Sequence, residues 1–270
     1  MDDISYYLTY DLPVPYRNLK IYPVRIKDYM HFVGFSQCLL LEKNYVPDVK
    51  IIAMTELEYI FHLTFTEPSK NPQLLWFDRM LALILKEEDS FNDFETSIGR
   101  YRYDEKGKPV FEIGGVVYTS RDFEEIKRIV CEQNNIVLPD ENISKEVRDS
   151  LEAARKYKEK LSGTTPGSLE DFVVSLALVT GWTLEYVNEM TVRKFVLSLR
   201  RMDNFVHYKI YLSASLSGMV EFKDKSFIKH WLDGLAQSED RYTDVSMNLD
   251  EIKGKVSLEN AKTQEAGKYK

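Results

Sequence analysis

Histidines are the side chains in this sequence best suited to acid–base or metal chemistry, and their spacing argues against both roles. None has a second histidine or a cysteine at the spacing of a metal site, and the His-Glu-x-x-His motif is absent. Each lies in a stretch with helical periodicity, so packing or capping explains them better than catalysis. The four are His31, His62, His207 and His230.

Carboxylates, serines and glycines give the same result. Neighbouring acids such as Glu124 and Glu125 point in different directions on a helix, so they form a solvated face rather than a catalytic pair. No Gly-x-Ser-x-Gly elbow and no phosphate-binding glycine loop occurs, and Gly114-Gly115 is typical of a hairpin turn. We therefore assign no catalytic residue, no cofactor and no metal ligand, and we expect a protein that is not an enzyme. An unrecognised active site is the lesser alternative.

The two cysteines and the N-terminus bear on the compartment. Cys38 and Cys131 lie in apolar, helix-like surroundings, so we expect buried thiols in a reducing cytoplasm, with a disulfide as the lesser alternative. The first residues, Met1-Asp2-Asp3, are acidic where a signal peptide would be basic. No apolar run approaches the ~20 residues that cross a bilayer. These features predict a protein that does not enter a membrane.

The composition predicts a globular protein that does not favour nucleic acid. Hydrophobic residues make up 44% of the 270 residues and aromatic residues 13%, enough for one large core or two smaller ones. The formal net charge is −7, whereas nucleic-acid binders usually carry a basic domain or stripe.

Hydrophobic periodicity predicts a mainly helical N-terminal region over residues 1–95. Residues 11–16 contain two prolines and are expected to be extended, and alternation over residues 19–26 predicts a short β-hairpin or strand. Three helices are expected next. The first has Asp28 as its cap and continues to about Lys43, the second covers residues 48–65, and the third begins at Asn71-Pro72.

The next part, residues 96–162, combines a small β-meander with two helices. Strands are expected at residues 98–103, 110–113 and 116–118, with Gly114-Gly115 as the second turn. Thr119 or Ser120 then caps a helix that ends at Asn134-Asn135, and a charged helix follows from Ser144 to Gly163.

Residues 163–167 form the predicted linker, and residues 168–236 a C-terminal helical bundle. Ser168 and Asp171 resemble a capping box, and the apolar run over residues 172–179 predicts a buried helix. Thr183 and Thr191 cap further helices, the second ending near residue 201, before helices at residues 204–217 and 227–235. Residues 237–270 are expected to be a flexible tail. The predicted class is therefore mainly α, within α+β.

Candidate partner-binding residues are aromatic or basic. Tyrosine is enriched at protein interfaces, and the proline-rich N-terminal stretch is hard to bury, which makes it the first candidate for a docking arm. Basic residues on the helix after Thr191 fall opposite its apolar face and favour an acidic protein partner over nucleic acid. The candidates are Tyr6, Tyr7, Tyr10, Tyr16, Tyr22, Arg193, Arg200, Arg201 and Trp231.

Three groups of segments resemble a known family. They are residues 11–16 with 19–24; residues 122–127 through 131–134; and residues 190–192 with Phe195, 217–220 and 230–231. Together they resemble tail proteins of contractile-tailed bacteriophages, of the T-even baseplate hub type, over residues 11–235. Members of this family are described as baseplate hub components or as tail assembly chaperones that attend the tape-measure protein. The family has no agreed catalytic residues, so the resemblance implies no active site.

The leading hypothesis is a non-enzymatic phage tail or baseplate assembly protein that acts by protein–protein binding. The resemblance implies tape-measure or baseplate hub proteins as partners, and a location in the host cytoplasm during assembly, with the virion tail as a further location. Homo-oligomerisation stays open. The alternative is a nucleic-acid-associated regulator that uses residues 168–236.

Overall fold

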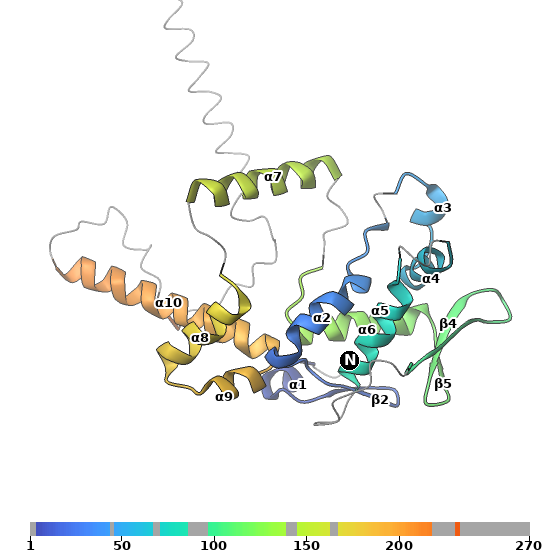
Figure 1. The fold of residues 1–270 in the computed structure, drawn as a ribbon, viewed down its shortest axis with the longest axis horizontal. Coiled ribbons are helices and arrows are strands. Elements are labelled where there is room, and N and C mark those ends of the chain that lie inside the picture. Colours follow the sequence, from blue (N-terminus) through green and yellow to red (C-terminus); the bar gives the residue numbers. More distant parts are fainter. Residues whose placement is uncertain are drawn as a thin grey trace, which may run out of the picture. The chain divides into compact units, whose positions relative to one another are not determined.

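A computed structural model describes residues 4–43, 46–66, 71–85, 97–138, 145–162, 167–217 and 230–232 (Figure 1). The mainly helical α+β class is confirmed. The chain divides into two compact units, Met1–Glu141 with Gly167–Leu235, and Asn142–Pro166 with Ala236–Lys270. The domain boundaries expected from the sequence stay a prediction. In the second unit the described element is the charged helix α7, Lys145–Ser162, at the place where the sequence predicts it.

The first unit opens with a helix and the predicted short β-hairpin. Helix α1 (Ile4–Tyr10) is followed by antiparallel strands β1 (Val14–Tyr16) and β2 (Leu19–Ile21), so part of the proline-rich stretch is paired as a strand. The 3-10 helix η1 (Ile26–Asp28) then leads into α2 (Tyr29–Phe35).

The predicted helix from Asp28 to Lys43 is wrong in two respects. Asp28 occupies the N-cap position of α2, but its side chain makes no capping hydrogen bond. The α-helix ends at Phe35 and tightens into the 3-10 helix η2 (Ser36–Leu39). The Ser36 hydroxyl donates to the Val33 carbonyl, which competes with regular helical bonding at this point.

The single helix expected over residues 48–65 is two helices, α3 (Val49–Ile52) and α4 (Glu56–Thr66). Thr55 separates them because it caps α4: its hydroxyl accepts the Glu58 N–H at 3.2 Å, and its own N–H donates to the Glu58 carboxylate at 2.6 Å. Helix α5 (Gln73–Ile84) begins one residue later than predicted, because Pro72 occupies the N-cap position instead of the first turn.

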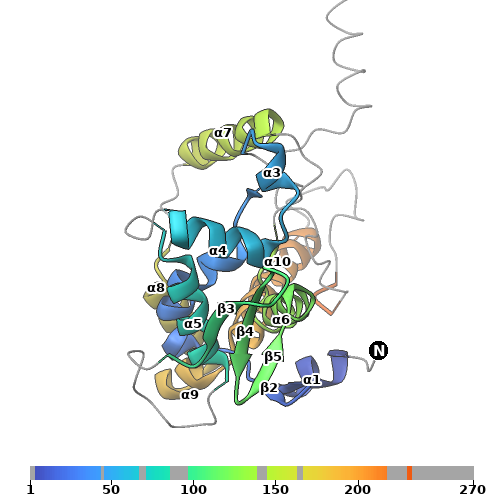
Figure 2. The same cartoon turned by 90° about the vertical axis from the view of Figure 1, so that its right-hand side faces the viewer.

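The predicted β-meander and the helix after it are confirmed. Strands β3 (Arg100–Tyr103), β4 (Pro109–Ile113) and β5 (Val116–Tyr118) form an antiparallel sheet in the order β3-β4-β5. Helix α6 (Ser120–Gln133) starts with a capping box formed by Thr119 and Asp122, and Asn135 takes the left-handed conformation after its end. Figure 2 shows this sheet together with α5 and α6.

Three helices close the described part of the first unit: α8 (Leu169–Thr180), α9 (Leu184–Glu189) and α10 (Val192–Leu216). The predicted caps Ser168, Thr183 and Thr191 all accept hydrogen bonds from the first turn of their helices. The predicted break near residue 203 is wrong, because no glycine or proline interrupts α10.

The last expected helix, residues 227–235, is described only at residues 230–232, which form a turn rather than a helix. Residues 163–166 of the predicted linker and the predicted tail lie outside the described residues.

Aromatic rings from three elements form the centre of the core. Phe77 of α5 lies 5.3 Å from Phe111 of β4 and 5.1 Å from Phe123 of α6, measured between ring centroids. The buried cluster continues to Val187 of α9 and Phe195 of α10, so the C-terminal helices share this core.

Backbone hydrogen bonds attach the C-terminal helices to the N-terminal region. The Ile26 N–H donates to the Met190 carbonyl at 2.9 Å, and the Val192 N–H donates to the Val24 carbonyl at 2.8 Å. The Glu189 carboxylate accepts from Lys27 and Arg25, and these bonds hold its pKa below the usual value. None of the described helices is both long and apolar enough to cross a membrane.

Candidate functional site

Helix α8 has exposed apolar side chains as well as buried ones. Val173, Leu176 and Ala177 are buried, at angles that centre on one side of the helix. Outside this side Leu178 is 78% exposed and Val179 60%, and Phe172 at its edge is 45% exposed. The prediction of a buried helix is therefore wrong for half of α8, since a helix that is apolar all round normally has both sides covered.

Helix α9 and the turn before it extend the exposed apolar surface. Trp182 and Tyr186 make a T-shaped ring contact at 5.3 Å, and both side chains are exposed, as is Leu184. Val187 is fully buried and anchors α9 to the core, while α8 packs against both α9 and α10. We call these exposed side chains the α8–α9 surface: Phe172, Leu178, Val179, Trp182, Leu184 and Tyr186.

The charge of this segment has one sign. Residues 167–189 contain four carboxylates and no lysine, arginine or histidine. Asp171 bonds to Ser168 in the capping box, which lowers its pKa, and Glu189 is paired with Lys27 and Arg25. Glu170 and Glu185 are exposed on α8 and α9. The charged side chains that α8 and α9 themselves contribute to this surface are therefore all acidic.

The predicted tyrosines have different environments. Tyr6 and Tyr10 of α1 are 58% and 62% exposed, and their ring centroids lie 5.0 Å apart. Tyr7 packs against the core, and Tyr22 is half-buried. Only the first two present most of their ring to solvent.

Tyr16 has a structural contact that the sequence analysis did not anticipate. Its hydroxyl donates to the Asp122 carboxylate at 2.8 Å, and Arg17 donates to the same oxygen at 3.1 Å. Burial and the bond to Asp122 raise the pKa of Tyr16 to about 12. The N-terminal hairpin is thus tied to the start of α6, and its role as a docking arm stays a prediction.

The predicted basic residues of α10 are partly engaged within the chain. Arg193, Arg200 and Arg201 are half-buried, and Arg201 donates to the Trp231 carbonyl at 2.7 Å. The Trp231 ring contacts Phe205 at 5.4 Å. The neighbouring Lys194 forms an ion pair with Asp11 at 2.7 Å.

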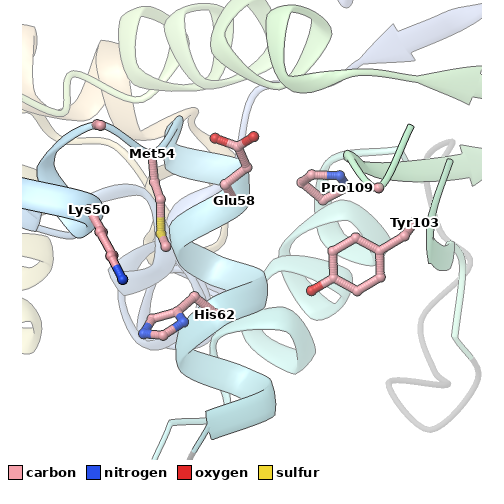
Figure 3. A pocket seen from close by; sticks show the side chains of 8 residues that line it. Lys50, Met54, Glu58, His62, Tyr103 and Pro109 are labelled. Atoms are coloured by element: carbon pink, nitrogen blue, oxygen red, sulfur yellow. The ribbon is translucent and has the colours of Figure 1, made fainter. Parts of the chain in front are cut away.

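A pocket of about 340 Å³ opens between α3, α4 and the β3–β4 turn (Figure 3). Lys50, Met54, His62 and Tyr103 line it together with Glu58. Glu58 is committed to the cap at Thr55, and in the described part of the chain no hydrogen bond joins the side chains of Lys50, His62 and Tyr103. The pocket therefore holds no linked base and nucleophile.

The cysteines are buried free thiols, as predicted. Burial raises the pKa of Cys131 to about 12 and that of Cys38 still further, so both stay protonated and unreactive. Among the described residues no group of three or more histidine, cysteine or acidic side chains is placed to hold a metal ion.

One comparison with known proteins covers a range that contains the α8–α9 surface. Residues 158–235 match the family model described as the YomV second domain. This name belongs to a phage-derived protein, so the match indicates a phage protein and leaves its role in the phage open. No curated protein and no solved structure matches the chain.

The α8–α9 surface was not predicted, because an apolar run does not show how many sides of its helix are covered. Two signals were present. The run of residues 172–179 is apolar except for Ser175, and the segment around it lacks any basic residue. The first feature also fits a buried core helix, so the absence of basic residues is the signal that favours a surface of one charge sign.

Proposed function

We propose that this phage protein acts by binding other tail proteins during assembly of the tail or baseplate, without catalysis of its own. The α8–α9 surface is the observation that carries the proposal. It exposes six large apolar side chains inside the segment that matches a phage family, and such a surface is typical of a protein interaction site. Tape-measure and baseplate hub proteins are the partners that the family resemblance suggests.

A protein partner is favoured over nucleic acid because of the local charges. The nucleic-acid alternative depends on basic residues of α10, and two of these, Lys194 and Arg201, are engaged with Asp11 and Trp231. The exposed apolar side chains also lie in a segment whose charged residues are all acidic, and these would repel phosphates.

Quantitative mass spectrometry of purified virions and of the infected-cell lysate tests the role. A fixed small copy number in the virion identifies a tail or baseplate component. A protein that is abundant in the lysate and missing from virions acts as an assembly chaperone. Absence from both contradicts the phage role.

A pull-down with the tail proteins of the same phage tests the surface. The double variant Leu178→Ser/Val179→Ser should lose capture of the tape-measure or hub protein. Val49→Ser is the matched control, because Val49 is 81% exposed on α3, outside the α8–α9 surface. If wild type, the double variant and Val49→Ser all capture the tail protein equally, the binding site lies elsewhere.

A further inference from the structure

We infer that the α8–α9 surface binds a cationic amphipathic helix. This inference rests on the proposed function, protein binding through this surface, and adds the chemistry of the partner. It depends on three observations: which side chains are exposed, which charges border them, and which backbone groups are available.

The exposed side chains favour an apolar stripe on the partner. Leu178 and Val179 project from α8, and Trp182 and Tyr186 add an aromatic pair beyond its C-terminus. Aromatic and aliphatic anchors of this size are the residues that dominate binding energy when a partner covers them. The partner therefore needs apolar side chains at i, i+3, i+4 and i+7 to meet them.

The backbone favours a helix over an extended segment. The surface consists of two helices whose peptide groups are bonded internally, so it offers no strand edge for an added strand. Helix α8 has 12 residues and is about 18 Å long, which matches a partner helix of three to four turns.

The border charges require positive side chains on the partner. Glu170 and Glu185 are exposed, and helices α8 and α9 themselves contain no basic residue. A second copy of this chain would bring two acidic borders together, which disfavours self-association through this surface. Lysine or arginine beside the apolar stripe of a partner would pair with both glutamates.

Calorimetric titration of the full-length protein with designed peptides tests the inference. The probe is a helical peptide of roughly 18 residues with a leucine stripe and lysine elsewhere. The first control peptide has the same leucine stripe with glutamate in place of lysine. The second is a scrambled leucine–lysine peptide without a stripe. We expect the striped lysine peptide to bind, the glutamate peptide not to bind, and the scrambled peptide to bind at least about tenfold more weakly.

Two pairs of substitutions assign the binding to this surface. Glu170→Lys/Glu185→Lys should weaken the striped lysine peptide about tenfold and reduce the salt dependence of its affinity. Leu178→Ser/Val179→Ser should abolish binding. The matched controls are Val49→Ser and Glu105→Lys, since both residues are exposed on other elements. If the Leu178→Ser/Val179→Ser variant does not fold, the Glu170→Lys/Glu185→Lys variant still tests whether the peptide binds at this surface, because both glutamates are exposed.

The outcomes separate this inference from the proposed function. The inference is overturned if the glutamate peptide or the scrambled peptide binds as tightly as the striped lysine peptide. It is also overturned if neither pair of substitutions changes the affinity of the striped lysine peptide. If Leu178→Ser/Val179→Ser loses capture of a tail protein and the lysine peptide does not bind, the docking surface stands and its partner chemistry is wrong. If the peptide binds as expected and no tail protein is captured, the partner chemistry stands and the assembly role fails.

Discussion

At the residue scale, Asp78 shows how a buried charge is stabilised in this fold. It is 4% exposed and accepts hydrogen bonds from the N–H groups of Ile98 and Gly99, the latter at 2.9 Å, and from the Tyr101 hydroxyl at 2.6 Å. Burial and this last bond raise the pKa of Tyr101, so its phenol stays protonated as a donor. Asp78 thereby fixes the segment before β3 against α5.

Replacing Asp78 should cost more stability than replacing Tyr101. Asp78→Ala leaves two backbone N–H groups and a hydroxyl without their acceptor, so we expect a loss of about 3 kcal/mol or more in the free energy of unfolding. Tyr101→Phe removes one hydrogen bond and should cost about 1 kcal/mol. Urea titrations of both variants measure the difference, and equal losses would show that the Asp78 bonds to the backbone contribute little.

Asp122 should make stability depend on pH in acid. Burial raises its pKa, but hydrogen bonds from Thr119 and Tyr16 and the charge of Arg17 outweigh burial and bring the pKa below its usual value of 3.8. Because the pKa is lower in the folded state, the stabilisation is present above this value and disappears as the pH falls through the folded pKa. Asp122→Asn should cost roughly 1–2 kcal/mol at pH 7, and the gap from wild type should close below about pH 4.

Unfolding curves of wild type and Asp122→Asn at a series of pH values measure this gap. Glu105→Gln is the control, since Glu105 is an exposed residue of the β3–β4 turn and its replacement should change stability little at any pH. A gap that stays constant down to pH 2 would contradict the lowered pKa of Asp122.

At the element scale, local capping signals predicted several boundaries and apolar runs predicted burial less well. The capping box at Ser168, a cap at Thr119 or Ser120 and the β-meander turn at Gly114-Gly115 were predicted because each depends on neighbouring residues. The exposed side of α8 was not visible, because burial depends on which distant elements happen to cover a helix. The α8–α9 surface is therefore the part of the candidate site that only the structure could reveal.

Thr55 makes the boundary between α3 and α4 a testable feature. The same four residues, Thr55 to Glu58, form a capping box that the sequence contained and the prediction of one helix overlooked. Thr55→Ala removes the hydroxyl that accepts the Glu58 N–H and should cost about 1 kcal/mol of stability. Thr55→Ser keeps that hydroxyl and should stay within a few tenths of wild type in thermal or urea unfolding. If both variants lose the same stability, the loss comes from the missing threonine methyl group and not from the cap.

At the scale of the whole molecule, long-range polar contacts determine which segments pack together, and no sequence pattern predicted these contacts. The buried Asn134 side chain accepts the Val24 N–H at 2.9 Å, and Gln133 donates to the Ile21 carbonyl at 3.0 Å. Glu56 and Lys127 form an ion pair that is nearly excluded from solvent and joins α4 to α6. Each pair lies 71 or more positions apart in the sequence, so local periodicity carries no information about it.

These contacts predict that residues 4–138 and 167–217 unfold in a single cooperative transition. The Ile26–Met190 and Val192–Val24 hydrogen bonds and the shared core would have to break together. Trp76 in α5 and Trp182 beside α9 report on the two segments separately. In variants that keep one tryptophan and replace the others by phenylalanine, the two fluorescence signals should show the same urea midpoint and the same slope. Separate midpoints would instead support the independent C-terminal bundle that the sequence predicted. In that case the contacts of Glu189 with Arg25 and Lys27 would join two domains that are each stable without the other.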